Sequence, residues 1–167
     1  MISEEVEEFF TFLQLAKQKA ASAAHIPFQR REEFTDVAIK NILEAIEQSK
    51  NILTFKDDWD GEGSPAYKAA TWQRAAAFLR HSALQLWQAH QVILDVPKIL
   101  PGPVGSIDLH WKTDRRELLI NIPEALDEPA NFYGDDSVST DHLLGQMVKG
   151  ILDTSKDSQW LLMWLMQ

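Results

Sequence analysis

The clearest structural signal in the chain is the sequence Ile107-Asp-Leu-His-Trp-Lys112, followed by Thr113-Asp-Arg-Arg116 and then Glu117-Leu-Leu-Ile-Asn-Ile122. Apolar and polar residues alternate on both sides of the four-residue segment, which is the period of a β-strand with one buried face. A turn of this length pairs apolar residues with one another: Trp111 with Leu118, Leu109 with Ile120, and Ile107 with Ile122. We therefore predict an antiparallel β-hairpin whose apolar side chains share one face.

The elements on either side of the hairpin are predicted from the spacing of apolar residues. A third short strand is expected at about 131–133, because two strands alone are marginally stable. Elsewhere apolar residues recur at every third or fourth position, as in a helix with one buried face. This spacing predicts helices over about 3–24, 33–50, 65–91, 140–151 and 160–166. The prolines and glycine of residues 95–103 predict a crossing loop before the sheet.

The predicted fold class is therefore α+β. N-terminal helices and a long central helix precede a small antiparallel sheet of two or three strands, at about 104–133, and C-terminal helices follow it. A length of 167 residues fits one domain, so we expect residues 1–167 to form a single α+β domain.

The composition is that of an acidic globular chain. The formal net charge is −9, and an acidic surface repels phosphate backbones, so we expect no nucleic-acid partner. The chain has no cysteine, which excludes disulfides, thiolate catalysis and cysteine-based zinc sites. The acidic first residues are the reverse of a signal peptide, and no apolar run approaches the ~18 residues of a membrane span. These features predict a cytoplasmic protein with no membrane partner.

Four segments together resemble a family of small uncharacterised bacterial proteins. They are Trp59-Asp-Gly-Glu-Gly-Ser-Pro65, Pro101-Gly-Pro-Val-Gly-Ser-Ile-Asp-Leu-His-Trp111, Leu118-Leu-Ile-Asn-Ile122 and Phe132-Tyr-Gly-Asp135. Members of that family carry a W-D-G-x-G loop, a long helix, a Pro-rich crossing and a Gly-led strand ending in Trp. The resemblance covers about residues 50–136 and implies a bacterial or phage-related origin. The family has no established activity, so the resemblance transfers no catalytic residue.

The acidic loop before the long helix is a candidate metal site. Asp58, Asp60 and Glu62 alternate and Gly63 follows, as in the first half of a calcium-binding EF-hand loop. The twelfth position should be a bidentate Glu but is Ala69, so an EF-hand is not expected. A weaker Mg²⁺ or Ca²⁺ site, completed by groups elsewhere in the chain, is one interpretation of this loop.

The other interpretation of the acidic loop is structural, and it requires no cofactor. Gly61 and Gly63 are suited to positive φ angles, Asp60 to bonding nearby amides, and Trp59 to anchoring the loop on the core.

The outer face of the hairpin is a second polar cluster. It carries Asp108, His110 and Lys112 on one strand, and the register places Asn121 opposite Asp108. A carboxylate, an imidazole and an amine can act as base, acid and anchor in a site. The exposed face of an antiparallel sheet is, however, polar for solubility alone. The sequence contains no H-E-x-x-H, G-x-S-x-G, P-loop or G-x-G-x-x-G motif, so we predict no catalytic residue and lean against an enzyme.

Two further segments are candidates for contacts with a partner. Residues 117–141 contain acidic residues but no Lys or Arg, which suits a basic partner. The C-terminal run that includes Trp160, Leu161, Met163 and Trp164 is apolar on every side. A helix without a polar face needs cover all round, so this run belongs either in the core or against a second chain.

The sequence favours a small acidic protein-binding module, similar in role to an antitoxin, an inhibitor or a subunit, that binds a protein partner or forms a homo-oligomer. The first alternative is a metal-dependent hydrolase that uses Asp58, Asp60 and Glu62 together with His110 or Asp108. The second alternative is a structural component of a phage or mobile element.

Overall fold

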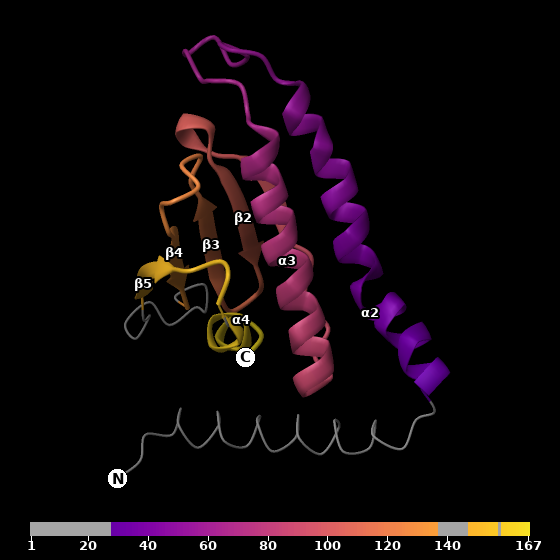
Figure 1. Cartoon of the computed structure of the whole chain (residues 1–167). Helices are drawn as coiled ribbons and strands as arrows, with labels where there is room; N and C mark the ends of the chain where they lie inside the picture. Colours follow the sequence, from indigo (N-terminus) through magenta and orange to yellow (C-terminus); the bar gives the residue numbers. More distant parts are fainter. Residues whose placement is uncertain (1–27, 137–146, 157) are drawn as a thin grey trace.

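The protein is described from a computed structural model, which covers residues 28–136, 147–156 and 158–167. Its helices are α2 (Phe28–Gln48), α3 (Ala69–His90) and α4 (Gln159–Leu165), with short 3₁₀ turns at η1 (Ser49–Thr54) and η2 (Pro103–Gly105). Its strands are β1 (Lys98–Pro101), β2 (Ile107–Lys112), β3 (Glu117–Ile122), β4 (Ala130–Asp135) and β5 (Met147–Leu152). The strands form one antiparallel sheet in the order in which they occur along the chain. Figure 1 shows α3 between the sheet and α2, with α4 near the lower end of the sheet.

The β2–β3 hairpin has the predicted register. The observed partners include Trp111 with Leu118, Leu109 with Ile120, and Ile107 with Ile122. All of these side chains are buried in the core that α3 and α4 complete. The turn is closed by the Thr113 N–H, which donates to the Arg116 carbonyl at 2.8 Å. The hairpin prediction is thus confirmed.

The predicted sheet of two or three strands is wrong, because the sheet has five. The third predicted strand is present as β4, but β1 and β5 extend the sheet on both sides. β1 lies in the Pro-rich segment for which a loop is predicted. A proline cannot donate to a strand ladder and is tolerated at a sheet edge. β1 is such an edge strand, since it pairs only with β2, and it ends at Pro101.

The prediction of a helix over about 140–151 is wrong for the residues of this range that the structure describes. Residues 137–146 lie outside the described part, and Met147–Leu152 form β5. The apolar residues Met147, Val148 and Ile151 fit a helix by spacing alone. Gly150 would destabilise a helix by ~1 kcal/mol relative to Ala. Pairing with β4 places Val148 and Leu152 beside the core-facing Gly134 and Ala130 instead.

The other helix predictions agree with the structure to within a few residues at each end. The helices predicted over 33–50, 65–91 and 160–166 correspond to α2, α3 and α4. α3 begins after Pro65 because Lys68 has an extended backbone, with φ −81° and ψ 137°. The helix predicted over 3–24 lies outside the described residues. Within the part of the chain that the structure describes, no helix has both the length and the apolarity needed to cross a membrane.

Gly134 gives a direct test of how α4 packs on the sheet. A Cβ atom at this position would lie 2.7 Å from the Trp164 ring and 2.7 Å from a Val148 methyl group. We expect Gly134→Ala to lower the free energy of unfolding by about 1–3 kcal/mol, because a rigid ring and a strand must both move. Urea denaturation measures this change. The loss should shrink in a Trp164→Leu background, and an equal loss in both backgrounds would show that the ring does not pack there.

Candidate functional site

The carboxylates of the acidic loop at residues 56–65 bind the loop itself. Asp57 Oδ1 accepts a hydrogen bond from the Ala66 N–H at 2.8 Å, and Asp58 Oδ1 accepts one from the Gly63 N–H at 2.8 Å. Asp60 Oδ1 accepts two, from the Glu62 N–H at 3.0 Å and the Ser64 N–H at 3.2 Å. The Ser64 hydroxyl also donates to Asp60, and this bond is the main reason that the pKa of Asp60 lies below its ordinary value. Hydrogen bonds to the ionised form of a carboxyl stabilise it. Asp60 therefore acts as a local organiser of the loop.

The backbone of the same loop supports the structural interpretation. Gly61 and Gly63 have φ angles of 73° and 85°, and Asp58 has a φ of 61°. The Trp59 ring stacks on Phe55 with centroids 4.5 Å apart, which ties the loop to the core beneath it. Among the residues that the structure describes, no three His, Asp or Glu side chains are grouped so that they could hold a metal ion. Binding of Mg²⁺ or Ca²⁺ by Asp58, Asp60 and Glu62 stays a prediction.

On the outer face of the sheet, the predicted pair of Asp108 and Asn121 is present. Asn121 Nδ2 donates to Asp108 Oδ1 at 2.6 Å and to Ser106 Oγ at 2.7 Å. Ser106 Oγ in turn donates to the Pro103 carbonyl at 2.7 Å. This chain of bonds joins β2 and β3 to the η2 turn, so its first consequence is to fix the conformation of that turn.

His110 does not join this chain of bonds. Its Nε2 lies 2.6 Å from Glu117 Oε1, and this bond is the main cause of the lowered pKa of Glu117. Ser106 and His110 are four positions apart along an extended segment, which separates them by about 13 Å. An imidazole at that distance cannot take the proton of the hydroxyl. The outer face thus holds two separate polar groups, one around Asn121 and one in which Glu117 contacts His110 and Lys112, and Ser106 and His110 form no catalytic pair.

Burial changes the acidity of Asp108. Desolvation raises the pKa of Asp108 above its ordinary value, and the hydrogen bond from Asn121 and the neighbouring His110 reduce this rise. A raised pKa means that ionised Asp108 costs the folded state free energy. This cost is present above the raised pKa and disappears as the pH falls toward 3.8.

The C-terminal residues that the sequence assigns to the core or to a partner are mostly buried. Leu161 and Met163 have exposed fractions of 0% and 3%. Trp164 is partly buried, and the Arg116 guanidinium lies 4.9 Å from the centroid of one of its rings. Trp160 is 54% exposed and packs edge-on against Phe132. Of these residues, Trp160 offers the largest surface to a partner.

The β3–β4 loop, residues 123–129, forms a candidate binding site that no sequence motif indicates. Arg74 of α3 holds its backbone: Nη1 donates to the Ala125 carbonyl at 3.2 Å and Nη2 donates to the Glu128 carbonyl at 2.6 Å. Arg74 Nε also donates to Thr154 Oγ1 at 3.1 Å, just after β5. The guanidinium thus binds carbonyls of the loop, and the side chains of Asp127 and Glu128 stay exposed to solvent.

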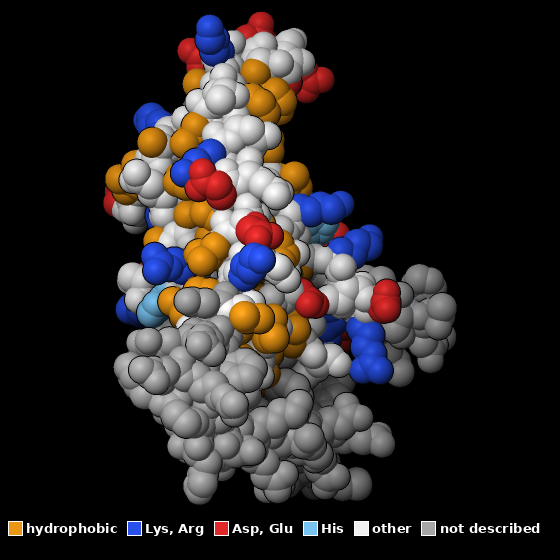
Figure 2. All heavy atoms as spheres, turned by 90° about the vertical axis from the view of Figure 1, so that its right-hand side faces the viewer, with side chains coloured by type: hydrophobic (Ala, Val, Ile, Leu, Met, Phe, Trp, Pro, Cys, Tyr) orange, Lys and Arg blue, Asp and Glu red, His pale blue; other side chains and the backbone are white. Residues whose placement is uncertain are grey.

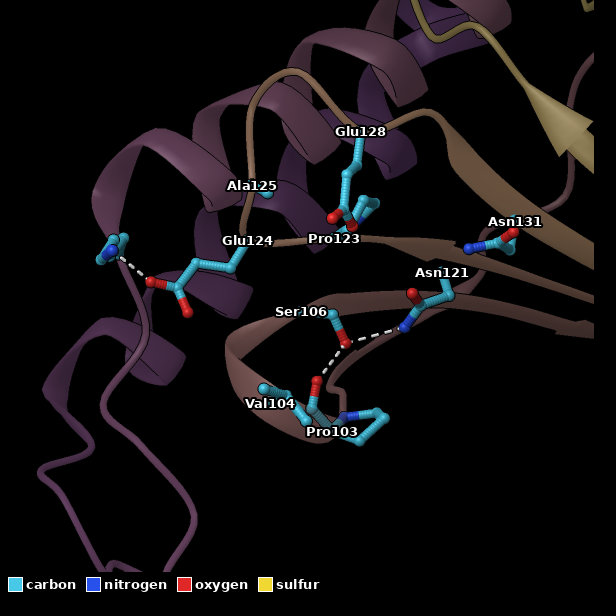
Figure 3. Close-up of a pocket in the computed structure, with 10 residues that line it drawn as sticks. Pro103, Val104, Ser106, Asn121, Pro123, Glu124, Ala125, Glu128 and Asn131 are labelled. Atoms are coloured by element: carbon cyan, nitrogen blue, oxygen red, sulfur yellow. Dashed lines mark hydrogen bonds and ion pairs between the residues drawn. The ribbon is translucent and has the colours of Figure 1, made fainter.

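Two hollows adjoin this loop and share Glu128. The first has a volume of about 550 Å³ and is also lined by Ser106 and Asn121, which Figure 3 shows across from the loop. The second has a volume of about 560 Å³ and lies against Ile151 and Thr154. Hollows of this size are in the range of ligand and anchor-residue pockets, ~300–1,000 Å³.

The walls of the hollows carry three strongly exposed large aliphatic side chains. Val104, at the first hollow, is 79% exposed, and Leu126 and Ile151, at the second, are 62% and 72% exposed. Val104 also has a left-handed backbone, with φ 54° and ψ 38°. A β-branched residue in this conformation is strained, and strain of this kind concentrates at functional positions.

Some of the carboxylates at the hollows form ion pairs and others do not. Glu124 forms an ion pair with Lys68, and Asp153 pairs with Lys156 at 3.2 Å. The Asp127 and Glu128 carboxylates have no hydrogen bond or ion pair within the described residues. We call the set formed by Val104, Glu124, Leu126, Asp127, Glu128 and Ile151 the loop surface. Its acids belong to the segment for which a basic partner is predicted. The sequence signal for its position is Leu126, an apolar residue between acids in a proline-bounded loop.

α2 also carries exposed aliphatic side chains, Val37 and Leu43. Figure 2 shows the face on which α2 lies, and in its coloured part hydrophobic side chains are interspersed with Lys, Arg, Asp and Glu. Apolar side chains scattered in this way are normal on a protein surface. The loop surface differs because its apolar side chains surround two hollows.

No family model matches the sequence, and comparison with curated proteins and with solved structures finds no match. The function must therefore be inferred from the geometry of this chain alone.

Removing the Arg74 guanidinium should loosen the β3–β4 loop. We expect Arg74→Leu to lower the free energy of unfolding by about 1–3 kcal/mol, because two carbonyls and one hydroxyl lose their donor. Hydrogen exchange should also become faster at residues 124–128. Arg80→Leu is the matched control, since Arg80 is an exposed arginine on the same helix. Equal exchange in both variants would show that Arg74 does not hold the loop.

Replacing Asp108 by Asn should stabilise the protein at neutral pH. The variant keeps an acceptor for Asn121 and removes the cost of the buried charge. Chemical denaturation at a series of pH values should show the largest difference from the wild type above the raised pKa of Asp108. The difference should fall as the pH approaches 3.8. A difference independent of pH would contradict this role of ionisation.

Proposed function

We propose that this chain is a protein-binding module and that its partner docks on the loop surface. The observation that carries the proposal is the combination of exposed Val104, Leu126 and Ile151 with two hollows and two unpaired carboxylates. Exposed apolar area rimmed by polar groups is typical of protein interaction sites. Arg74 fixes the loop before binding, which reduces the entropy that association would otherwise cost.

The charges of the loop surface define the chemistry of the partner. The Asp127 and Glu128 carboxylates are complementary to cationic groups of a partner, and the aliphatic side chains beside them are complementary to apolar groups. The partner is therefore expected to present a segment that is both basic and apolar. The net charge of −9 would accelerate the approach of such a segment.

A module of this kind suits an antitoxin, an inhibitor or a regulatory subunit of bacterial or phage origin. We propose that it acts in the cytoplasm, and its lack of cysteine is compatible with a reducing compartment. The hydrolase alternative has less support, since Asp58 and Asp60 already accept hydrogen bonds from amides of their own loop. No observation favours the structural-component alternative.

A peptide-display selection against the whole chain tests the proposal. The selected peptides should combine Lys or Arg with aliphatic residues, and their binding is then measured by calorimetry. Leu126→Asp should weaken binding about tenfold or more, because a charge replaces an apolar contact at the centre of the surface. Ile93→Asp is the control, since Ile93 is an exposed aliphatic residue in the loop between α3 and β1. Selection of acidic peptides, or equal losses in the two variants, would refute the proposed surface.

A further inference from the structure

We propose that the hollow shown in Figure 3 holds the guanidinium group of an arginine supplied by the partner. The inference rests on the proposed function, and it names the side chain that anchors the partner. Three features of the hollow support it: its free acceptors, its charge and its apolar wall.

Most of the free polar groups of the hollow are acceptors, and the Asn131 side-chain amide, which also lines it, adds both a donor and an acceptor. The single Ser106 hydroxyl proton is donated to the Pro103 carbonyl, so Ser106 must accept from Asn121 Nδ2. Asn121 Nδ2 also donates to Asp108 Oδ1, which leaves the Asn121 carbonyl oxygen as the free end of this amide. The Glu128 carboxylate has no partner within the described residues. A ligand rich in donors and poor in acceptors complements this set.

The charged residues that line the hollow carry a net charge of one negative unit, because one carboxylate has no partner there. Lys68 and Glu124 both line it and form an ion pair with each other. Glu128 is the remaining charged residue of the lining. A cation would therefore complement the charge of the hollow, and a second anion would be repelled.

Among biological cations, a guanidinium fits these acceptors better than an ammonium. It presents five N–H donors in a plane and binds a carboxylate through two parallel hydrogen bonds. Glu128 can take that pair while the Asn121 carbonyl takes a further N–H. An ammonium is a compact point charge with three donors and no such fork.

The opposite wall suits the rest of an arginine side chain. Pro103 and Val104 of the η2 turn lie across the hollow from Glu128, while Pro123 lies beside Glu128, as Figure 3 shows, and all three apolar residues line the hollow. The methylene stem of an arginine packs on surface of this kind while its charged end reaches the polar groups. Val104 reaches the rim through the η2 turn, which is closed by the bonds from the Ser106 N–H and hydroxyl to the Pro103 carbonyl.

The test uses N-acetyl-arginine methylamide as a small probe, which requires no knowledge of the partner. Titration of the whole chain, followed by NMR, should shift the side-chain amide signals of Asn121 and Asn131, which both line the hollow. The citrulline analogue has nearly the same shape but no charge, and it should bind about tenfold more weakly. The lysine analogue should also bind more weakly than the arginine probe.

Glu128→Gln should weaken binding of the arginine probe about tenfold, because the charged half of the hydrogen-bonded pair is lost. Glu62→Gln is the matched control: Glu62 is also exposed and lines neither hollow beside the β3–β4 loop, and its replacement changes the net charge equally. The control should bind as the wild type does.

Equal binding of the arginine and citrulline probes, or equal losses in the two variants, would overturn the assignment. Tighter binding of free arginine than of the capped probe would overturn the partner as its source and indicate a small metabolite. The selected peptides of the previous section separate this inference from the proposed function. If they bind through Leu126 but the arginine probe does not bind, the docking surface stands and the arginine anchor fails.

Discussion

The pairing of β2 with β3 is the constraint on which the rest of the structure depends. Its register places large apolar side chains, with Trp111 the largest, on the face that α3 and α4 cover. Strand side chains alternate between faces, so a slip of one residue would carry Asp108, His110 and Asn121 into the core. Burying unpaired carboxyl, imidazole and amide groups costs several kcal/mol, so the alternative register is strongly disfavoured. The same register brings Asn121 to Ser106 and thereby fixes the η2 turn at the edge of the candidate site.

The parts of the fold that follow from local pattern could be predicted from the sequence. Alternation and turn length were enough for the hairpin, and helical spacing was enough for α2, α3 and α4. β5 could not be found in this way, because the spacing of Met147, Val148 and Ile151 is that of a helix, and in the strand Met147 and Ile151 lie on the exposed face. What makes them a strand is the free edge of β4, which is a tertiary partner. β1 was missed for the related reason that Pro101 is compatible with a strand only at a sheet edge, and edges are a property of the assembled sheet.

In the candidate sites, too, the features set by local sequence could be predicted and those set by tertiary contacts could not. The acidic loop at residues 56–65 was visible as a motif, and its carboxylates serve their own backbone. The acidic character of the β3–β4 loop was also visible. Its conformation was not, because Arg74 reaches it from 51 and 54 positions away along the chain. No local spacing encodes a bond of that range. The hollows on either side exist only after α3, the η2 turn and the end of β5 have come together.

Arg74 recognises main-chain oxygens, and every residue type at positions 125 and 128 offers the same carbonyl group. The shape of the β3–β4 loop is therefore uncoupled from the identity of the side chains that it displays. Replacing Leu126, Asp127 or Glu128 would leave the two bonds from Arg74 to the main chain in place. For the binding module proposed above, the displayed side chains could then change while the scaffold stays constant, as in a paratope carried on a conserved framework.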